Sequence, residues 1–522
     1  MTKDTLSAAS ARHPKPPNTT FAYGTAGFRT LGSLLDSTVF RVGVLAALRS
    51  AKLRGKTIGV MITASHNPPQ DNGVKVVDPL GEMLPQLWEP YATQLANSDN
   101  LEDDVRDIVA REKIDVAQAG LVVVGMDTRE TSPQLLRAAV DGIEVFGRAK
   151  SFGELTTPQL HYLVRSHNDP GFGEPSENGY NKKIVSAVEE ILRLWNVSEP
   201  LEITVDAANG VGAPKLRNLS SDLLNISVVN SNTQDKSALN VECGADYVKT
   251  NQKLPANVQP RDHQLYSSFD GDADRVVFYY TDNSRFQLLD GDRIATLLAS
   301  FINKLLQQAK VEAKMGIIQT AYANGDSTKY IQETLQIPVD FTPTGVKHLH
   351  HKAQEYDIGV YFEANGHGTV LFSEKLISKL KCTHTGLPEE ERALKTLVLL
   401  TEVINQTVGD SISDLFAVLL ALRIQNKTCV DWGKDYTELP NKLFKVIVKD
   451  RFVFKTTDAE RRLVEPAGLQ AKIDALVAAY VRGRSFVRAS GTENAVRVYS
   501  EAASAADCAD LGARVCQLLE PY

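Results

Sequence analysis

Short apolar runs alternate with longer amphipathic stretches over most of the chain. Residues 59–63 (GVMIT), 121–125 (LVVVG) and 201–206 (LEITVD) have the length and the apolar, β-branched composition of strands. The stretch 132–143 (SPQLLRAAVDGI) follows the second run and has the spacing of an amphipathic helix. This alternation predicts repeated β–α–β units around parallel or mixed sheets.

Breaks in this pattern suggest domain boundaries. Residues 166–179 (SHNDPGFGEPSENG) are rich in Gly, Pro, Asn and Ser, which is typical of a linker. Further breaks lie near residue 291 and over 426–440, after the apolar, helix-like run 412–422. We therefore predict four domains, at residues 1–175, 176–292, 293–430 and 431–522.

Composition narrows the class of protein. The 522 residues are 43% hydrophobic and 23% charged, which is the balance of a globular protein with several cores. A formal net charge of −7 repels a phosphate backbone and anionic lipid, so we predict neither a nucleic-acid nor a membrane partner. The five cysteines include no C-x-x-C pair, and no apolar run approaches the ~18 residues of a membrane span. With no signal-peptide pattern in the first twenty residues, we expect a cytoplasmic protein.

The segment 270–275 (DGDADR) carries the most specific chemistry and lies between two strand-like runs. Side chains two residues apart share one face of an extended backbone, so Asp270, Asp272 and Asp274 can bind one cation through oxygen. Arg275 stands where an EF-hand needs glycine, which excludes that loop. Three carboxylates fit Mg²⁺ with an open position for a phosphate, and a solvated acidic turn is the alternative.

A second loop, 63–68 (TASHNP), follows the run GVMIT. Ser65 stands beside His66, but the G-x-S-x-G turn of a serine hydrolase is absent and neighbouring side chains on extended backbone point apart. A phosphorylated Ser65 would bring about −1.5 to −2 charges and three acceptor oxygens, which could fill the open position on the cation. The loop therefore predicts a phosphoryl carrier, with a plain turn as the alternative. Lys75, in NGVK, is a candidate proton donor or acceptor.

Three further loops place polar residues on short turns. Residues 488–497 (RASGTENAVR) combine small residues, whose N–H groups can face an anion, with an arginine at each end. A helix capping box is the alternative there, although the strand-like alternation that follows argues against it. Residues 363–368 (EANGHG) place a carboxylate, an amide and an imidazole on a turn suited to sugar hydroxyls. Residues 24–29 (GTAGFR) place an arginine on a glycine-bearing loop.

Taken in order, these five loops resemble the motif set of the α-D-phosphohexomutase superfamily, spread over nearly the whole chain. Within it, EANGHG and the segments 319–325 (QTAYANG), 342–347 (TPTGVK) and 244–250 (GADYVKT) most resemble the eukaryotic members that act on N-acetylglucosamine phosphates. The resemblance implies an α/β architecture of four domains around a central cleft. Three of them would be related α/β domains with mixed sheets, and the smaller C-terminal domain would be α+β.

The resemblance also implies a role for each matched residue. Ser65 would carry the phosphoryl group and, with Asp270, Asp272 and Asp274, bind the metal. The groups around the transferring phosphoryl would be His66, Lys75, Arg29 and Arg275. The sugar would be held by Glu363, Asn365, His367, Thr344, Gly345 and Lys347, the last also a candidate acid or base. The non-reacting phosphate would be held by Arg488, Ser490, Gly491, Thr492, Asn494 and Arg497.

The implied activity is the interconversion of N-acetylglucosamine 6-phosphate and N-acetylglucosamine 1-phosphate, in UDP-N-acetylglucosamine biosynthesis. Phosphorylated Ser65 would donate its phosphoryl group, the resulting 1,6-bisphosphate would turn end over end, and its other phosphate would return to the serine. We expect one Mg²⁺ per chain, the bisphosphate as intermediate and activator, a small-molecule substrate and a monomer. The alternatives are a phosphoglucomutase or phosphomannomutase, a catalytically silent sugar-phosphate-binding paralogue and a serine phosphatase. The sequence does not decide which residue is the general base.

Overall fold

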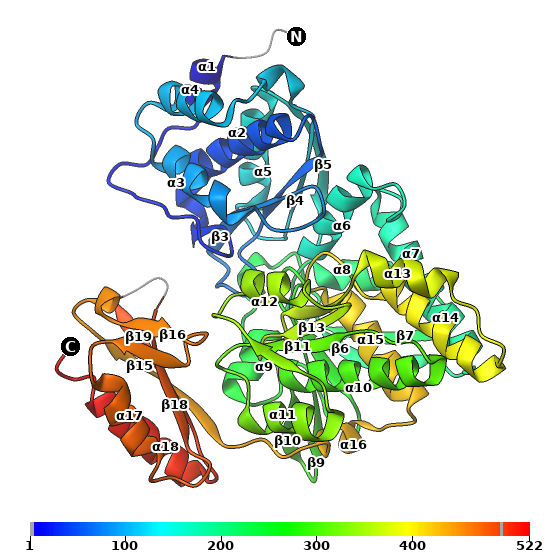
Figure 1. Ribbon diagram of the computed structural model, residues 1–522. Helices are drawn as coiled ribbons and strands as arrows, with labels where there is room; N and C mark the ends of the chain where they lie inside the picture. Colours follow the sequence, from blue (N-terminus) through cyan, green and yellow to red (C-terminus); the bar gives the residue numbers. More distant parts are fainter. Residues whose placement is uncertain (1–4, 491–493) are drawn as a thin grey trace. The chain divides into compact units, whose positions relative to one another are not determined.

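The structure is a computed structural model that describes residues 5–490 and 494–522. The chain folds into two compact units, and each unit is built from two separate stretches of sequence. Figure 1 shows the elements, coloured along the chain. The first unit comprises Met1–Asp290 and Glu391–Cys429, and the second comprises Gly291–Glu390 and Val430–Tyr522.

The N-terminal sheet of the first unit has the order β1–β3–β2–β4–β5. Strands β2, β4 and β5 are parallel, β3 is antiparallel to β2, and β1 is antiparallel to β3. Helices α2, α5 and α6 pack against β2 and β4, which buries β2 along its whole length. The bounds are β1 Phe28–Leu31, β2 Ile58–Ile62, β3 Asp71–Val77, β4 Leu121–Met126 and β5 Arg148–Glu154, with α1 Leu6–Ser10, α2 Asp36–Lys52, α3 Glu89–Asn97, α4 Leu101–Glu112, α5 Ser132–Glu144 and α6 Thr157–Asn168.

The second sheet of this unit has the order β10–β9–β8–β6–β7 and repeats the pattern. Strands β7, β6 and β8 are parallel, and β9 and β10 continue the sheet in antiparallel fashion. Helix α15 is buried over most of its length and contacts α7 and β9. The bounds are β6 Leu201–Asp206, β7 Leu224–Val229, β8 Tyr266–Phe269, β9 Val276–Asp282 and β10 Arg285–Leu289, with α7 Glu177–Leu194, α8 Gly212–Arg217, α9 Ala245–Asn251, α14 Pro388–Val403 and α15 Ser411–Ile424. Helix α16 (Cys429–Gly433) begins at the last residue of this unit and otherwise belongs to the second.

The second unit opens with a four-stranded sheet of order β12–β11–β13–β14. Strands β12, β11 and β13 are parallel and β14 is antiparallel, so the same pattern occurs a third time. The bounds are β11 Met315–Gln319, β12 Val339–Phe341, β13 Ile358–Phe362 and β14 Gly368–Phe372, with α10 Gly291–Ala309, α11 Gly325–Lys329, α12 Val346–Ala353 and α13 Glu374–Cys382.

The C-terminal part of this unit is smaller and antiparallel. It contains a three-stranded sheet of order β15–β19–β18, a two-stranded sheet β16–β17, and helices α17 and α18, which share a core with the larger sheet. The predicted α/β class, with three related mixed sheets and an α+β C-terminal part, is confirmed. The bounds are β15 Asn441–Ile447, β16 Lys455–Thr457, β17 Arg462–Glu465, β18 Arg484–Ala489 and β19 Ala495–Glu501, with α17 Leu469–Val477 and α18 Ala505–Gln517.

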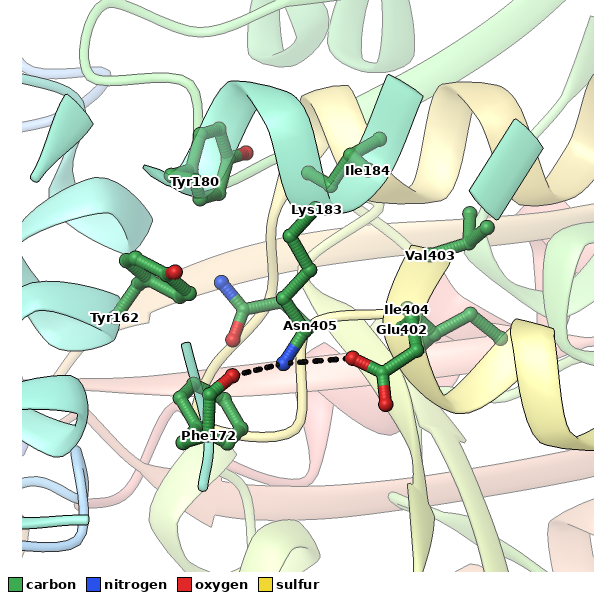
Figure 2. Close-up of a pocket in the computed structure, with 9 residues that line it drawn as sticks. All are labelled: Tyr162, Phe172, Tyr180, Lys183, Ile184, Glu402, Val403, Ile404 and Asn405. Carbon is green, nitrogen blue, oxygen red and sulfur yellow. Dashed lines mark hydrogen bonds and ion pairs between the residues drawn. The ribbon is translucent and has the colours of Figure 1, made fainter. Parts of the chain in front are cut away.

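The segment expected to be a linker, 166–179, is held by contacts within the first unit. Lys183 on α7 donates to the Phe172 carbonyl at 2.5 Å, and its ammonium lies 3.1 Å from a Glu402 oxygen on α14. These residues line a cavity of about 10 Å³ (Figure 2), which has room for no more than a single water molecule. The cavity is therefore a packing feature and too small for a ligand.

Across residues 5–490 and 494–522, no helix combines the length and the apolar character that crossing a bilayer requires.

Candidate active site

Ser65 lies on the turn that follows β2, at the carboxyl end of a central strand. Its backbone has φ of +52°, in the left-handed region that non-glycine residues seldom adopt. The side chain is fully buried, and its hydroxyl donates to Asp270 Oδ2 at 2.5 Å and lies 3.5 Å from Asp274 Oδ1. The unusual turn therefore directs the serine hydroxyl into the loop between β8 and β9.

Three buried carboxylates meet on that loop. Asp270, Asp272 and Asp274 each offer an oxygen, and these oxygens lie within 4.8 Å of one another. Asp272 Oδ2 accepts from Thr157 Oγ1 at 2.6 Å and from Thr63 Oγ1 at 3.1 Å, whereas its buried Oδ1 has no hydrogen-bond partner among the described residues. Oxygen ligands of this number and charge suit Mg²⁺, and the unmatched oxygen fits a cation at this place.

The neighbouring carboxylates also shift the pKa of Asp270. Burial, and then the neighbouring Asp274 and Asp272, raise the pKa of Asp270 well above its usual range. A divalent cation bound to the same oxygens favours the ionised form and opposes this shift. A bound cation would therefore offset the negative charge of the three carboxylates.

Cationic side chains surround the cluster. Lys75 on β3 places its ammonium 3.4 Å from Asp274 Oδ2 and 3.7 Å from Asp272 Oδ2. Arg275 contacts both oxygens of Asp246, at 2.7 and 2.9 Å. Positive charge beside the carboxylates suits an anion such as a phosphoryl group.

His66 and Arg29 stand beside this group. Burial and the neighbouring Arg275 lower the pKa of His66 to about 4, so its imidazole is neutral near pH 7. The same two causes lower the pKa of Arg29, whose guanidinium nevertheless stays protonated because arginine does not lose its proton in proteins. Arg29 NH1 lies 3.5 Å from Asn67 Oδ1, on the same loop as Ser65. The structure thus places every predicted residue of the catalytic and metal groups in one unit.

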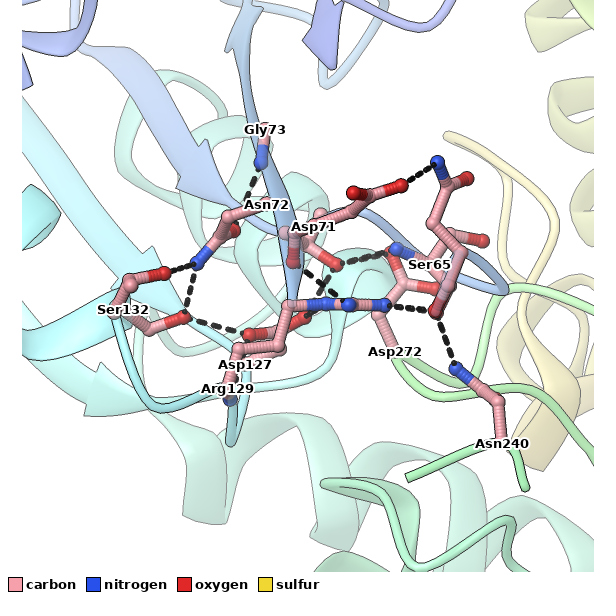
Figure 3. Close-up of polar contacts among 12 residues, drawn as sticks. Ser65, Asp71, Asn72, Gly73, Asp127, Arg129, Ser132, Asn240 and Asp272 are labelled. Atoms are coloured by element: carbon pink, nitrogen blue, oxygen red, sulfur yellow. Dashed lines mark hydrogen bonds and ion pairs between the residues drawn. The ribbon is translucent and has the colours of Figure 1, made fainter. Parts of the chain in front are cut away.

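Sequence reasoning missed several polar residues around these loops (Figure 3). Thr157 holds Asp272 through both its hydroxyl and its backbone N–H, the latter bonded to the Asp272 carbonyl at 3.1 Å. Asn240 donates to the Ser65 carbonyl at 3.0 Å. Asp127 and Arg129 lie just after β4, which ends one residue beyond the predicted strand 121–125. Polar residues at the carboxyl ends of parallel strands are the available signal for such roles.

Residues 363–368 (EANGHG), which were predicted to bind the sugar, form a tight turn between β13 and β14. The Glu363 N–H donates to the His367 carbonyl at 2.9 Å, and Asn365 Oδ1 accepts from the His367 N–H at 3.1 Å. Thr344, Gly345 and Lys347 lie at the start of α12, after β12. Since β11, β12 and β13 are parallel, the loops that follow them emerge at one edge of the sheet.

The segment predicted to bind the non-reacting phosphate, residues 488–497, runs from β18 into β19. Arg488 on β18 and Arg497 on β19 are direct cross-strand partners. Lys445 on β15 pairs with Arg497 in turn, so three cations form a row across the sheet. Two guanidinium groups and an ammonium on one face of a sheet are suited to charge-assisted hydrogen bonds with an anion. No motif in the sequence points to Lys445. Ser490 closes the turn through its N–H, 2.8 Å from the Ala495 carbonyl, and Asn494 is exposed.

Gly491 and Thr492 lie outside the described residues, so their predicted contacts stay a prediction. Arg488 is held meanwhile by the Tyr322 hydroxyl at 2.8 Å and by Glu460 at 3.3 Å. The other Glu460 oxygen accepts from Thr344, at 2.8 Å from its N–H and 2.5 Å from its hydroxyl. A carboxylate therefore occupies a place beside Arg488 that would suit a phosphate.

Models of protein families match four successive parts of the chain. Residues 43–102 match the alpha/beta/alpha domain I of phosphoglucomutase and phosphomannomutase, and residues 443–518 match the C-terminal domain of the same group. Residues 174–277 and 290–427 match domains II and III of phosphoacetylglucosamine mutase AMG1.

Whole-chain relatives carry the same name. Phosphoacetylglucosamine mutase from Candida albicans is 51% identical over 541 aligned residues, which cover 99% of this chain and 99% of the relative. The protein of that name from Saccharomyces cerevisiae is also 51% identical, with 93% of each chain covered.

Solved structures extend the likeness to three dimensions. A crystal structure of N-acetylglucosamine-phosphate mutase in its product complex has a TM-score of 0.96 and 52% identity, covering 99% of both chains. Aspergillus fumigatus N-acetylphosphoglucosamine mutase in complex with GlcNAc-6P and magnesium has a TM-score of 0.94 and 47% identity, covering 98% of this chain and 97% of that one. A serine-to-alanine variant of the A. fumigatus enzyme, in complex with glucose 1,6-bisphosphate, has a TM-score of 0.92 at 47% identity and the same coverage.

Proposed function

Since the chain belongs to the phosphoacetylglucosamine mutase family, we propose that it interconverts N-acetylglucosamine 6-phosphate and N-acetylglucosamine 1-phosphate. The observation that carries the proposal is the buried Ser65 hydroxyl, 2.5 Å from Asp270 in a cluster of three carboxylates. Relatives crystallised with GlcNAc-6P and magnesium, and with glucose 1,6-bisphosphate, support both the substrate class and a bisphosphate intermediate.

The carboxylates of Asp270, Asp272 and Asp274 would hold the Mg²⁺ ion, together with an oxygen on Ser65. When bound, the ion supplies positive charge that offsets the charge on the phosphoryl oxygens. The residues present fit it, because Asp272 Oδ1 is buried with no hydrogen-bond partner in the described chain, and because burial and then the neighbouring Asp274 and Asp272 raise the pKa of Asp270.

The side chains around Ser65 stabilise the transferring phosphoryl group. As the bond from phosphorus to Ser65 Oγ breaks, a new bond forms to the free sugar hydroxyl, whose proton must leave. Phosphoryl transfer needs positioning and charge stabilisation more than covalent assistance. Lys75, Arg275 and Arg29 supply fixed positive charge, and neutral His66 can donate or accept a hydrogen bond without adding charge.

The second unit would recognise the rest of the substrate. The row of Lys445, Arg497 and Arg488 would bind the non-reacting phosphate, and the EANGHG turn would bind sugar hydroxyls. Because the same cations must hold the 6-phosphate in one orientation and the 1-phosphate in the other, the intermediate has to turn between the two transfers. The phosphate and sugar roles of individual residues are part of this proposal.

Two further expectations belong here. The five cysteines are all free, which is typical of a reducing compartment and supports a cytoplasmic location. The monomeric state and the lack of a nucleic-acid partner stay predictions from the sequence, and light scattering on the purified protein would test the first of them.

The proposal is tested by Ser65→Ala, with Ser50→Ala as the matched control. Ser65→Ala removes the phosphoryl acceptor, so the rate of isomerisation should fall at least ~1,000-fold. Ser50 is also buried and its hydroxyl donates to the Lys56 carbonyl, away from the site, so its variant should keep the wild-type rate. Intact-mass analysis of the active enzyme should find one phosphoryl group, at Ser65.

Rates should be measured side by side with N-acetylglucosamine 6-phosphate, glucose 6-phosphate and mannose 6-phosphate. The proposal expects the first to have the highest kcat/KM. A higher value for either of the others would favour a phosphoglucomutase or phosphomannomutase, and stoichiometric release of inorganic phosphate would favour a phosphatase. Near-normal turnover by Ser65→Ala would contradict the proposal that Ser65 carries the phosphoryl group.

A further inference from the structure

Arg129 has a fully buried side chain on the turn that follows β4. A guanidinium group carries five N–H donors in a rigid plane. All five have acceptors here, and four of them point to backbone carbonyls of the loop that carries Ser65 (Figure 3). The contacts are Nε to Asp127 Oδ2 (2.9 Å), NH1 to the carbonyls of Pro68 (2.6 Å) and Asp71 (2.8 Å), and NH2 to those of Ser65 (2.8 Å) and Asn67 (2.9 Å).

Asp127 fixes the plane of this guanidinium. Its Oδ1 accepts from the Arg129 N–H at 3.0 Å and from the Ser132 hydroxyl at 2.7 Å. Its Oδ2 accepts from Thr63 Oγ1 at 2.9 Å, and the same threonine oxygen accepts from the Ser65 N–H at 3.0 Å. Both sides of the Ser65 backbone are therefore tied, directly or through one side chain, to the turn after β4.

The loop needs such support because residues 63–70 lie outside the strands β2 and β3. Ser65 has a positive φ, and backbone of this kind persists only where its surroundings over-determine it. Asn240 adds a second donor to two of the same carbonyls, at 3.0 Å from Ser65 and 3.3 Å from Asn67. A buried cation saturated by four carbonyls and a carboxylate is thus the main restraint on the phosphoryl carrier.

We propose that Arg129, oriented by Asp127, is a positioning residue for phosphoryl transfer. It holds the backbone of residues 65–71 so that the Ser65 hydroxyl points at the metal carboxylates. The inference rests on the proposed function, because it needs Ser65 to accept a phosphoryl group. With no exposed surface, Arg129 cannot touch the substrate, and it acts only through the loop. A displacement of ~1 Å at a reacting group can cost ~100-fold in rate.

The test compares Arg129→Lys with Arg49→Lys. Lysine keeps the charge beside Asp127, but its three donors at one point cannot reach four carbonyls in a plane. Arg49 is a matched control because it forms a similar two-contact pair with Asp78, at 3.0 and 2.6 Å, and its side chain is 11% exposed. Both variants should lose thermal stability, and only Arg129→Lys should lose phosphoryl transfer.

The readout is the rate at which Ser65 is phosphorylated by glucose 1,6-bisphosphate with Mg²⁺, followed by rapid quench and intact mass. In this step the phosphoryl group leaves the sugar oxygen for Ser65 Oγ, and the serine proton ends on the sugar oxygen. We expect Arg129→Lys to load ~30- to 100-fold more slowly than Arg49→Lys. In isomerisation, kcat should fall by a similar factor while KM changes less than about threefold. A loss in loading rate below tenfold would overturn the inference.

A milder variant covers the case in which Arg129→Lys does not fold. Asn240→Ala removes two of the six contacts to these carbonyls and leaves Arg129 in place. Its loading rate should fall by about three- to tenfold, and a rate within twofold of the wild type would overturn the inference. Wild-type enzyme that loads Ser65 but does not isomerise N-acetylglucosamine 6-phosphate would contradict the proposed substrate alone, and the loading comparison would still decide the role of Arg129.

Discussion

Asp270 shows how the ionisation of one residue can depend on two neighbours. Its carboxyl group is buried beside Asp272 and Asp274, and their charges add to burial in raising its pKa. A carboxyl group binds a cation through its ionised form, so a proton and a cation compete for the oxygens of Asp270. Metal binding and proton release are therefore coupled at this position.

We predict that Mg²⁺ affinity falls as the pH falls. Below the raised pKa of Asp270, affinity should drop by up to ~10-fold per pH unit, because proton and cation compete for one carboxylate. Titration calorimetry in two buffers of different ionisation enthalpy, at pH 6, 7 and 8, should detect proton release on binding. Asp272→Asn removes one of the charges that raise this pKa, so the release should shrink in that variant. Equal affinity from pH 5.5 to pH 8 would contradict the coupling.

At the scale of elements, the two central loops approach each other through a glycine. A Cβ on Gly271 would lie 2.7 Å from the Ser65 carbonyl and 2.9 Å from Asn240 Nδ2. Helix α15 supports the same loop from another side, because Ser411 donates its N–H to the Ala273 carbonyl at 3.0 Å and its hydroxyl to the Arg275 carbonyl at 2.6 Å. The metal loop is thus clamped between the serine loop and the start of a buried helix.

Gly271→Ala should push the serine loop away from the carboxylates. Overpacking of this kind typically costs ~1–3 kcal/mol of stability, and kcat should fall more than ~10-fold because the reacting groups separate. Gly386→Ala is the control, since a Cβ there meets nothing within 4 Å. Melting curves and steady-state kinetics of both variants check the prediction, and wild-type kcat in Gly271→Ala would show that the contact is not needed.

At the scale of the whole molecule, the residues of the proposed reaction belong to both units of the chain. Ser65 and the three carboxylates belong to the first unit, whereas the EANGHG turn and the row of Lys445, Arg497 and Arg488 belong to the second. Midway through the reaction the bisphosphate is bound covalently to neither. Its retention would then depend on contacts of the second unit.

Arg497→Ala should let the intermediate escape. A charged hydrogen bond is worth ~1.5–3 kcal/mol, so kcat/KM should fall by roughly 10- to 100-fold in both directions. The escaped 1,6-bisphosphate should leave dephosphorylated enzyme and a new dependence on added bisphosphate, seen by intact mass and by activity titration. Arg514→Ala removes an arginine of α18 that contacts the Tyr480 hydroxyl, and it should leak no more than the wild type. An Arg497→Ala enzyme that keeps its intermediate would exclude this arginine from the phosphate site.

The sequence by itself predicted several of the strands, the α/β class and the loops that hold the candidate site residues. Each of these loops is a short contiguous segment between apolar runs, so residue types and spacing suffice to identify it. Asp270, Asp272 and Asp274 stand two residues apart in one segment, but a turn, and not the extended backbone predicted from this spacing, brings them together: Ala273 has φ of +58° and its N–H donates to the Asp270 carbonyl at 3.1 Å.

Only the tertiary structure decided how the serine loop is supported. Arg129 is 64 positions from Ser65 and Asn240 is 175 positions away, and Thr157 reaches Asp272 across 115 positions. No local pattern links residues at such separations, because their contacts depend on which strands become neighbours in the sheets. The same holds for Lys445, which joins Arg497 and Arg488 only through the pairing of β15 with β19. The candidate site residues stand in contiguous motifs, whereas the residues that support them come from distant positions and meet only when the chain folds.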